Sequence, residues 1–229
     1  MTIGIIGAMQ QEVDILRDQL SGLQTEQHGP ITLYKGTLNQ HNVVLVLSGV
    51  GKTAAAMATT ILIDRFNPEY VINTGSAGGY AEDLEIGDLV ISSEVRHHDV
   101  DLTAFGFEKG QGFGFPAAFH CHQDLIEKAL SAAAKQTELK TKVGLICSGD
   151  SFMDCPERVQ KAREDFPQMI AVEMEGAAIG QVCQQFDTPF VVIRALSDIA
   201  GKESHQSFDV FLEQAAKHSS KLILDMLEA

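Results

Sequence analysis

Two carboxylates, Glu173 and Glu175, flank a methionine in the otherwise apolar segment AVEMEGAAIG. Burial of an unpaired carboxylate is costly, so such a pair is expected where a partner or a ligand compensates its charge. The later apolar segment FVVIRALSD carries Arg194 and ends at Asp198, and the arginine can supply part of that compensation. The alternative is a buried ion-pair network that only fixes the register of the strands.

These side chains suit the breaking of a bond to an anomeric carbon. Such a reaction needs a proton donor for the leaving group, an activated water, and hydrogen bonds to the sugar hydroxyls. Glu12, one turn into the first expected helix, is a further carboxylate, although the helix dipole alone explains an acid at that place. The residue types leave open whether the leaving group is a sugar or a nucleobase.

The two glutamates need an element that presents them together. If MIAVEME is a strand, Glu173 and Glu175 lie on one face of it, with Met174 on the other face. They then stand at the C-terminal end of the strand, where α/β sheets bind their ligands. A neighbouring parallel strand would place Arg194 beside them.

Seven short apolar runs are typical of strands that are buried on both faces: TIGIIGA, NVVLVLS, YVINTG, DLVISSEV, KVGLICS, MIAVEME and FVVIRALS. Apolar residues at helical spacing lie between several of them, in residues 9–20, 52–65, 122–135, 175–187 and 207–228. Strands that alternate with helices predict an α/β sandwich around a mostly parallel sheet. One domain of residues 1–229 is the simplest organisation.

The composition excludes several classes of protein. The chain of 229 residues has 17 basic and 31 acidic residues, a formal net charge of −14, which argues against binding to nucleic acid or to an anionic membrane surface. No apolar run approaches the roughly 18 to 20 residues of a membrane-spanning helix, and the N-terminal residues lack the pattern of a signal peptide. Four cysteines without a CxxC pair predict reduced thiols and a cytoplasmic protein.

Two glycine-containing segments raise the question of phosphate binding. SGVGKTAAA follows a strand, but Val46 stands where a P-loop requires its first glycine, so a glycine turn before a helix is favoured. In NTGSAGG, three glycines would let backbone N–H groups approach a phosphate or a sugar closely, and Ser76 adds a hydroxyl. A tight turn would use the same residues, and the segment has no arginine.

Residues 97–119 contain five of the twelve phenylalanines, four glycines and one proline. A long loop with so many aromatic residues predicts a lid over a ligand or a contact with another subunit, rather than a packed loop. The loop begins with HHDVD, in which His97, Asp99 and Asp101 would share one face of an extended chain. Because no second cluster of ligands is visible, a structural role is favoured over a metal site.

Six segments together carry a resemblance to a known family, in their order and spacing: GIIGAMQQEV, SGVGKTAAA, NTGSAGG, HHDVDLTAFG, VEMEGAAI and RALSD. They resemble the bacterial 5'-methylthioadenosine/S-adenosylhomocysteine nucleosidases, and the similarity runs from Met1 nearly to the C-terminus. The resemblance implies a nucleoside phosphorylase-like fold, a three-layer sandwich around a mixed, mostly parallel sheet. It also implies a homodimer that hydrolyses the N-glycosidic bond to adenine in these nucleosides and in 5'-deoxyadenosine, without a cofactor or a metal.

The resemblance also implies roles for residues of this chain. Glu12 is expected to position the attacking water, with Ser76 and Arg194 nearby. Asp198 is expected to act as the general acid at adenine N7, which requires that it hold a proton near neutral pH. Glu175 matches the carboxylate that binds the ribose 3'-hydroxyl and, with Met174, the 2'-hydroxyl.

Further residues are expected around the substrate. Phe152 is expected to stack on adenine beside Met153, while Glu173 either orients the arginine or helps at the 2'-hydroxyl. The rest of the expected pocket is made by Met9, Val50, Ala77, Gly78, Ser197 and Phe208. The residues expected to close the thioalkyl end of the neighbouring subunit's pocket are Leu102, Phe105, Phe107 and Phe113.

Two alternatives remain at this stage. A purine nucleoside phosphorylase of the same fold would need a basic phosphate site, against which the arginine-free NTGSAGG segment and Glu12 argue. A nucleoside-binding protein without catalytic activity would have no need of Glu12, Glu175 and Asp198 together.

Overall fold

A computed structural model describes residues 2–202 and 204–228, with the backbone alone for residues 204–207. The helices of this part of the chain are α1 (Gln10–Arg17), α2 (Lys52–Phe66), α3 (Gln123–Ala133), α4 (Pro156–Asp165), α5 (Gly176–Gln185) and α6 (Ser204–Leu227), with a 3-10 turn at Thr103–Phe105. The strands are β1 (Thr2–Gly7), β2 (Ser21–His28), β3 (Ile31–Leu38), β4 (His41–Leu47), β5 (Tyr70–Asn73), β6 (Ser76–Gly79), β7 (Leu89–His97), β8 (Phe119–His120), β9 (Thr141–Ser148), β10 (Met169–Glu173) and β11 (Phe190–Ile199).

The strands form a mixed sheet in the order β2-β3-β4-β1-β5-β11-β6-β10-β9-β7-β8. Strand β11 pairs in parallel with β5 and β6, and it also pairs with β7 in the antiparallel sense. This additional pairing closes β11, β6, β10, β9 and β7 into a ring, while β2 to β5 and β1 continue as an open sheet. The predicted α/β class is confirmed, and the closed half is a feature that the apolar runs did not indicate.

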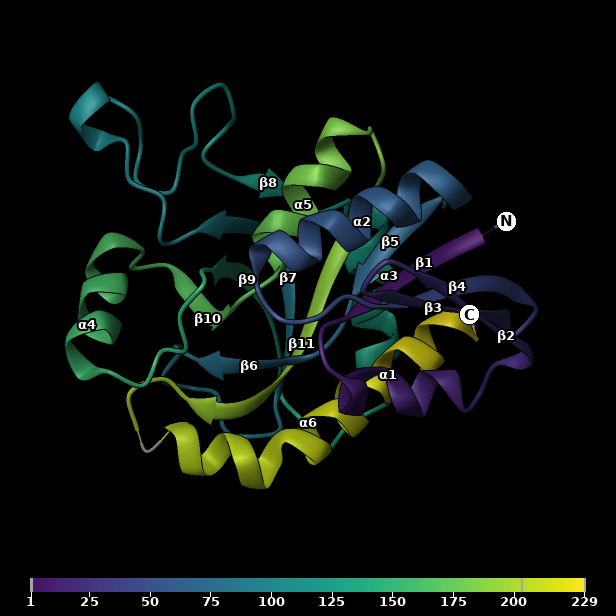
Figure 1. The fold of residues 1–229 in the computed structure, drawn as a ribbon. Helices are drawn as coiled ribbons and strands as arrows, with labels where there is room; N and C mark the ends of the chain where they lie inside the picture. The colour runs from purple at the N-terminus through teal and green to yellow at the C-terminus, as the bar shows by residue number, and fades with distance from the viewer. Residues whose placement is uncertain (1, 203, 229) are drawn as a thin grey trace.

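Helices cover both faces of the sheet (Figure 1). Helices α2 and α5 pack together on one face, whereas α6 packs along β11 and against α1 and α3 on the other. The apolar core runs through both faces, because the central strands are buried along nearly their whole length, as in β1, β5 and β11. None of the helices in the described part of the chain is long and apolar enough to cross a membrane.

The seven apolar runs all form strands, and the five expected helices are present with ends shifted by a few residues. Besides the short 3-10 turn, five elements were not expected: β2, β3, β6, β8 and α4. Strand β2 is almost wholly exposed and polar, SGLQTEQH, so it lacks an apolar pattern. Helix α4 buries only Val159 and Ala162 in the strongly polar segment PERVQKARED. Strand β6, SAGG, has no β-branched residue, and it lies where a loop was expected.

Candidate active site

A pocket lies where the ends of several strands meet loops from both halves of the sheet. It encloses about 590 Å³ of empty space, which includes the open solvent at its mouth. Its lining contains these residues expected from the sequence: Met9, Glu12, Val50, Ser76, Ala77, Gly78, Phe152, Met153, Glu173, Met174, Glu175, Ser197, Asp198 and Phe208. Three residues were not expected there, Ala8, Ser151 and Val172.

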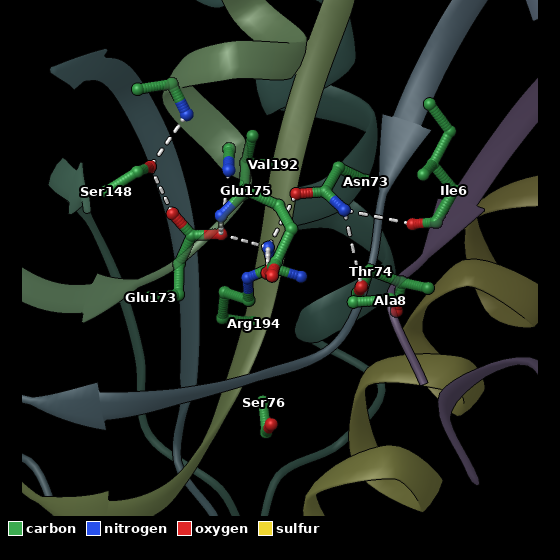
Figure 2. A network of polar contacts seen from close by, with 12 residues as sticks. Ile6, Ala8, Asn73, Thr74, Ser76, Ser148, Glu173, Glu175, Val192 and Arg194 are labelled. Atoms are coloured by element: carbon green, nitrogen blue, oxygen red, sulfur yellow. Dashed lines mark hydrogen bonds and ion pairs between the residues drawn. The ribbon is translucent and has the colours of Figure 1, made fainter. Parts of the chain in front are cut away.

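Arg194 lies behind this lining and holds its polar centre together (Figure 2). Its guanidinium is fully buried between Glu173 on one side and Asn73 on the other, with Nη2 at 2.7 Å from Asn73 Oδ1. The same nitrogen lies 3.6 Å from Glu175 Oε2. Burial lowers the pKa of Arg194, but the surrounding carboxylates outweigh this effect and raise it overall, so the group stays charged.

Glu173 is fully engaged by the protein. One oxygen accepts the Ser148 hydroxyl, and the other accepts Arg194 Nη2 and the N–H groups of Glu175 and Gly176, at 3.0 and 2.8 Å. The carboxylate therefore satisfies donors at the start of α5 while it pairs with the buried arginine. These contacts favour the expected orienting role of Glu173 over direct binding of a ligand.

The expected geometry of the glutamate pair is wrong in two respects. Strand β10 ends at Glu173, and Glu175 is the N-cap of α5, so the two side chains do not share a strand face. Arg194 does not reach them from a neighbouring parallel strand either, because β6 lies between β10 and β11. The three charges meet instead through the side chain of Arg194, which reaches from β11 to the end of β10 and the start of α5, and the linear order of apolar runs did not predict this.

Glu175 has one hydrogen-bond donor from the backbone. Its Oε1 accepts the Gly51 N–H at 2.8 Å, and its Oε2 faces Arg194 at the longer distance of 3.6 Å. Burial, and then the neighbouring Glu173 carboxylate, raise the pKa of Glu175 to about 8, against the opposing effects of Arg194 and Gly51. The Glu175 carboxyl therefore lines the pocket with fewer protein contacts than Glu173 has.

Glu12 also belongs to the pocket lining, and it joins two segments of the chain. Its Oε2 accepts the N–H groups of Ala8 and Met9 at 2.9 and 3.1 Å, just before α1. Its Oε1 accepts the N–H of Ser76 at 3.0 Å and the Ser76 hydroxyl at 3.2 Å. Glu12 thus serves the start of its helix, as the helix dipole suggests, and also lines the pocket.

A glycine permits the close approach of Glu12 to the arginine. At Gly75 the backbone has φ +150°, and a Cβ atom would lie 2.6 Å from both Glu12 Oε1 and Arg194 Nη1. Only a residue without a side chain fits between these two groups. The NTGSAGG segment therefore uses its first glycine to pack against charged side chains, as a bend between β5 and β6 rather than as a phosphate loop or a strand-to-helix turn.

Asp198 is 4% exposed near the end of β11. The pairing of β11 with β6 shifts between Leu196 and Asp198, so Ser197 is an extra residue in the strand. Such a bulge re-aims the side chains that follow it, and here Ser197 and Asp198 both line the pocket. The Ser197 hydroxyl donates to Asp198 Oδ1 at 2.9 Å.

Aromatic and apolar side chains form the remaining walls. Phe152 and Phe208 meet edge to face, with ring centroids 5.6 Å apart, beside the buried Met153. Val50 lies at the pocket and is 52% exposed, so this side is open to solvent. The pocket therefore has an apolar wall that can accept a flat ring and an open end that can accept a substituent.

Leu102, Phe105, Phe107 and Phe113 lie outside this chain's pocket lining. Their loop extends away from the body of the molecule (Figure 1). Phe105 and Phe113 are 78% and 80% exposed, and Phe113 packs only against Phe107 among the ring contacts of the described residues, with centroids 5.7 Å apart.

His97, Asp99 and Asp101 of HHDVD have separate protein partners. His97 Nε2 lies 2.9 Å from Gln181 Oε1, and Asp99 pairs with Lys52. Asp101 accepts hydrogen bonds from Thr103 and is paired with a lysine. Within residues 2–202 and 208–228, no group of three or more metal-ligating side chains is present.

Asn73 and Ser148 belong to the polar network although the sequence did not single them out. Each is the last residue of an apolar strand, YVIN or KVGLICS. A polar residue at the C-terminal end of a buried strand was the signal available for both, since ligand sites gather at such ends.

Comparison with known proteins places the chain in a family. The model of the phosphorylase superfamily matches residues 2–228. A 5'-methylthioadenosine/S-adenosylhomocysteine nucleosidase of Aeromonas salmonicida is 56% identical over 227 residues, which cover 99% of both chains. A protein of the same name from Bacillus pumilus is 54% identical over 228 residues, covering 100% of this chain and 99% of the relative.

Solved structures agree. A nucleosidase of this name from Colwellia psychrerythraea, in complex with adenine, has a TM-score of 0.97 and 56% identity, covering 99% of this chain and 94% of that one. The Neisseria meningitidis protein, in complex with methylthio-immucillin-A, has a TM-score of 0.97 and 45% identity, covering 99% and 98%. By sequence and by fold, this chain belongs to the 5'-methylthioadenosine/S-adenosylhomocysteine nucleosidase family within the phosphorylase superfamily.

Proposed function

We propose that this protein hydrolyses the N-glycosidic bond of 5'-methylthioadenosine and S-adenosylhomocysteine, and also that of 5'-deoxyadenosine, and releases adenine. The observation that carries the proposal is that Glu12, Glu175 and Asp198 line one pocket, next to an aromatic wall. Relatives that share more than half of the residues over the whole length are named for the first two substrates. A related structure contains adenine, the expected product.

Asp198 is the proposed general acid. Adenine leaves poorly as an anion, so a proton must reach N7 as the glycosidic bond breaks. The Asp198 side chain is buried, accepts the Ser197 hydroxyl, and faces the same pocket as Phe152 and Met153, the proposed adenine-binding residues. After proton transfer, the Asp198 carboxylate faces a neutral leaving group.

Glu12 is the proposed residue that holds the attacking water. Its oxygens already orient it rigidly through four donated hydrogen bonds, from Ala8, Met9 and Ser76. A water bound at its edge of the pocket would approach the anomeric carbon from the side opposite to adenine. Ser76 fixes the position of this carboxylate, and the positive charge of the buried Arg194 acts on it from nearby.

Glu175 and Met174 are the proposed ribose-binding residues. The Glu175 carboxyl has one backbone donor, Gly51 N–H, so it retains acceptor capacity for the 3'-hydroxyl. The acids Glu12 and Glu173 lie beside the single buried Arg194, and this excess of acidic groups stabilises the positive charge that develops on the sugar in the transition state.

Release of adenine in phosphate-free buffer tests the proposal. We expect purified protein to release adenine from methylthioadenosine at a rate that does not change when phosphate is added. A rate that vanishes without phosphate would assign the chain to the phosphorylases of the superfamily instead. Binding of the nucleoside without any release of adenine would indicate a binding protein, and either result would refute hydrolysis.

We further propose a cytoplasmic homodimer in which the loop of residues 97–119 closes the neighbouring pocket. The exposed rings of Phe105 and Phe113 and the open side at Val50 support this arrangement, because both leave apolar surface to be covered. All four cysteines are free, as is usual in a reducing compartment. Sedimentation of the unaltered protein tests the dimer, and the kinetics of Phe105→Ser and Phe113→Ser test the loop. We expect a dimer, and a raised KM for the nucleoside in both variants. A monomeric protein with full activity would contradict this arrangement.

A further inference from the structure

Lys52 and Asp99 are two charged residues to which the proposed reaction has given no role so far. Lys52 is the lysine of SGVGKTAAA, and Asp99 belongs to HHDVD at the start of the 97–119 loop. Lys52 Nζ lies 2.5 Å from Asp99 Oδ1, and the two side chains are only 19% and 29% exposed. The pair is therefore shielded more than a typical surface ion pair.

Asp150 makes the pair into a closed set of contacts. The Lys52 N–H donates to Asp150 Oδ1 at 2.8 Å, and the Asp150 N–H donates to Asp99 Oδ2 at 3.0 Å. The adjacent His98 N–H donates to the Ser148 carbonyl at 2.9 Å, which strengthens the same junction. We call Lys52, Asp99 and Asp150 the rim clamp.

The rim clamp borders the ribose side of the pocket. Gly51 precedes Lys52, and its N–H is the backbone donor to Glu175 Oε1. Its φ is +97°, and a Cβ atom there would lie 3.0 Å from Asp150 Oδ1, so the backbone is packed closely under the clamp. The N-terminus of α2 thus directs one N–H to Glu175 and the next to Asp150.

The rim clamp also borders the base side. Asp150 is followed by Ser151, Phe152 and Met153, all of which line the pocket. Because Asp150 is fixed through both its N–H and its carboxylate, the start of this wall is held at a set distance from α2.

We propose that Lys52 and Asp99 are positioning residues, whose ion pair, through Asp150, holds the Gly51 N–H on Glu175 and the Ser151–Met153 wall in place. The inference rests on the proposed function, since it assigns to Glu175 the ribose 3'-hydroxyl. It adds that the loop of residues 97–119 is tied to the pocket of its own chain at Asp99.

Kinetics of Asp99→Asn and Lys52→Gln test the proposal. We expect KM for methylthioadenosine to rise roughly threefold to tenfold, the scale of one partly shielded charged contact, with kcat changed less than about twofold. The Glu175 contact acts in the ground state and the transition state alike, so its loss falls on KM. For the 3'-deoxy nucleoside, which lacks the hydroxyl, the rise in KM should be smaller, because only the Ser151–Met153 wall then contributes to it. Lys52→Arg should restore most of the affinity.

Lys35→Gln is the matched control. Lys35 pairs with Glu26 at 2.9 Å, with side chains 32% and 28% exposed, and neither residue belongs to the pocket lining. It should leave both KM values unchanged. The positioning role would be overturned if KM in Asp99→Asn rose equally for the two nucleosides. It would also be overturned if the KM of Asp99→Asn for methylthioadenosine equalled that of Lys35→Gln.

Hydrogen exchange gives a readout that does not depend on activity. In Asp99→Asn, the amides of residues 50–53 and 149–153 should exchange faster together, whereas Lys35→Gln should change neither segment. Unchanged exchange in both segments would refute the rim clamp even where adenine is released. If the unaltered protein released no adenine, the proposed function would fail, and faster exchange would still support the clamp.

Discussion

Glu12 and Ser76 are joined twice, because Glu12 Oε1 accepts both the Ser76 N–H at 3.0 Å and the Ser76 hydroxyl at 3.2 Å. In Glu12→Gln, the amide NH2 would face a backbone N–H, either that of Ser76 or those before α1. We expect kcat for adenine release to fall at least ~100-fold, with adenine still bound. Ser76→Ala keeps the contact of the backbone N–H with Glu12, so kcat should fall less in this variant than in Glu12→Gln. A Glu12→Gln protein with more than half of the normal kcat would exclude the water-positioning role.

Asp198→Asn should lose at least ~100-fold in kcat if Asp198 protonates adenine. Asparagine keeps the approximate shape of the side chain, so the Ser197 contact can persist. A ribosyl substrate whose leaving group departs without protonation, such as a nitrophenolate, should be cleaved by the variant nearly as fast as by the unaltered protein. Near-normal turnover of methylthioadenosine by Asp198→Asn would rule out the acid.

The pocket residues and the strands were largely predictable, whereas the way in which the charges meet was not. Buried parallel strands are recognisable in the sequence as apolar runs. The family resemblance supplied pocket residues that lie far apart in the sequence, such as Phe208 of α6. Which strands are neighbours depends on contacts far apart in the sequence. The contact between Glu173 and Arg194 was predicted, but from neighbouring parallel strands. Strand β6 in fact lies between β10 and β11, so the geometric reason was wrong.

Polar or glycine-rich elements were missed for a related reason. Helix α4 and strand β2 have little apolar surface, so they take their structure from neighbours and not from their own pattern. The rim clamp could not be foreseen either, since Lys52 and Asp99 are 47 positions apart and come from two motifs with unrelated appearance.

Glu175→Gln should change how stability depends on pH. The pKa of Glu175 is raised from 4.5 to about 8, chiefly by burial and then by Glu173. Between these two pH values the folded state therefore holds a proton that the unfolded state releases. The contribution of Glu175 to the stability of the fold is full below about pH 4.5 and is lost as the pH rises to about 8. Glutamine cannot ionise, so the free energy of unfolding of the variant should not fall in this way. Relative to the unaltered protein, the variant should become more stable between pH 5 and pH 8, by on the order of a few kcal/mol.

Urea unfolding at the two pH values measures this difference. The exposed Glu138 provides the control, because Glu138→Gln should show the same pH dependence as the unaltered protein. If Glu175→Gln follows the pH profile of Glu138→Gln, the carboxyl at position 175 does not titrate in this range.

Gly75→Ala should impair both the fold and the site. A Cβ atom at this position would lie 2.6 Å from Glu12 Oε1 and from Arg194 Nη1, in addition to the strain of φ +150°. Gly22→Ala is the control, because φ is +67° there but nothing lies within 4 Å of the added atom. We expect about 1 kcal/mol of destabilisation for Gly22→Ala from backbone strain alone, and a larger loss for Gly75→Ala.

Thermal unfolding and adenine release together check this prediction. Gly75→Ala should lower both Tm and kcat, because Glu12 has to move, whereas Gly22→Ala should lower Tm only. Equal Tm values and equal rates for the two variants would mean that the site tolerates an atom at position 75.

Strand β11 pairs with β5, β6 and β7 and carries Arg194, Ser197 and Asp198. A strand with three neighbouring strands thus bears the proposed proton donor. Many enzymes place such groups on peripheral loops, which can vary without harm to the scaffold. Here one strand belongs to the scaffold and also carries the reactive groups, so it can change little without harm to the fold. Changes in substrate specificity have to arise elsewhere, at the open rim around Val50 and in the 97–119 loop.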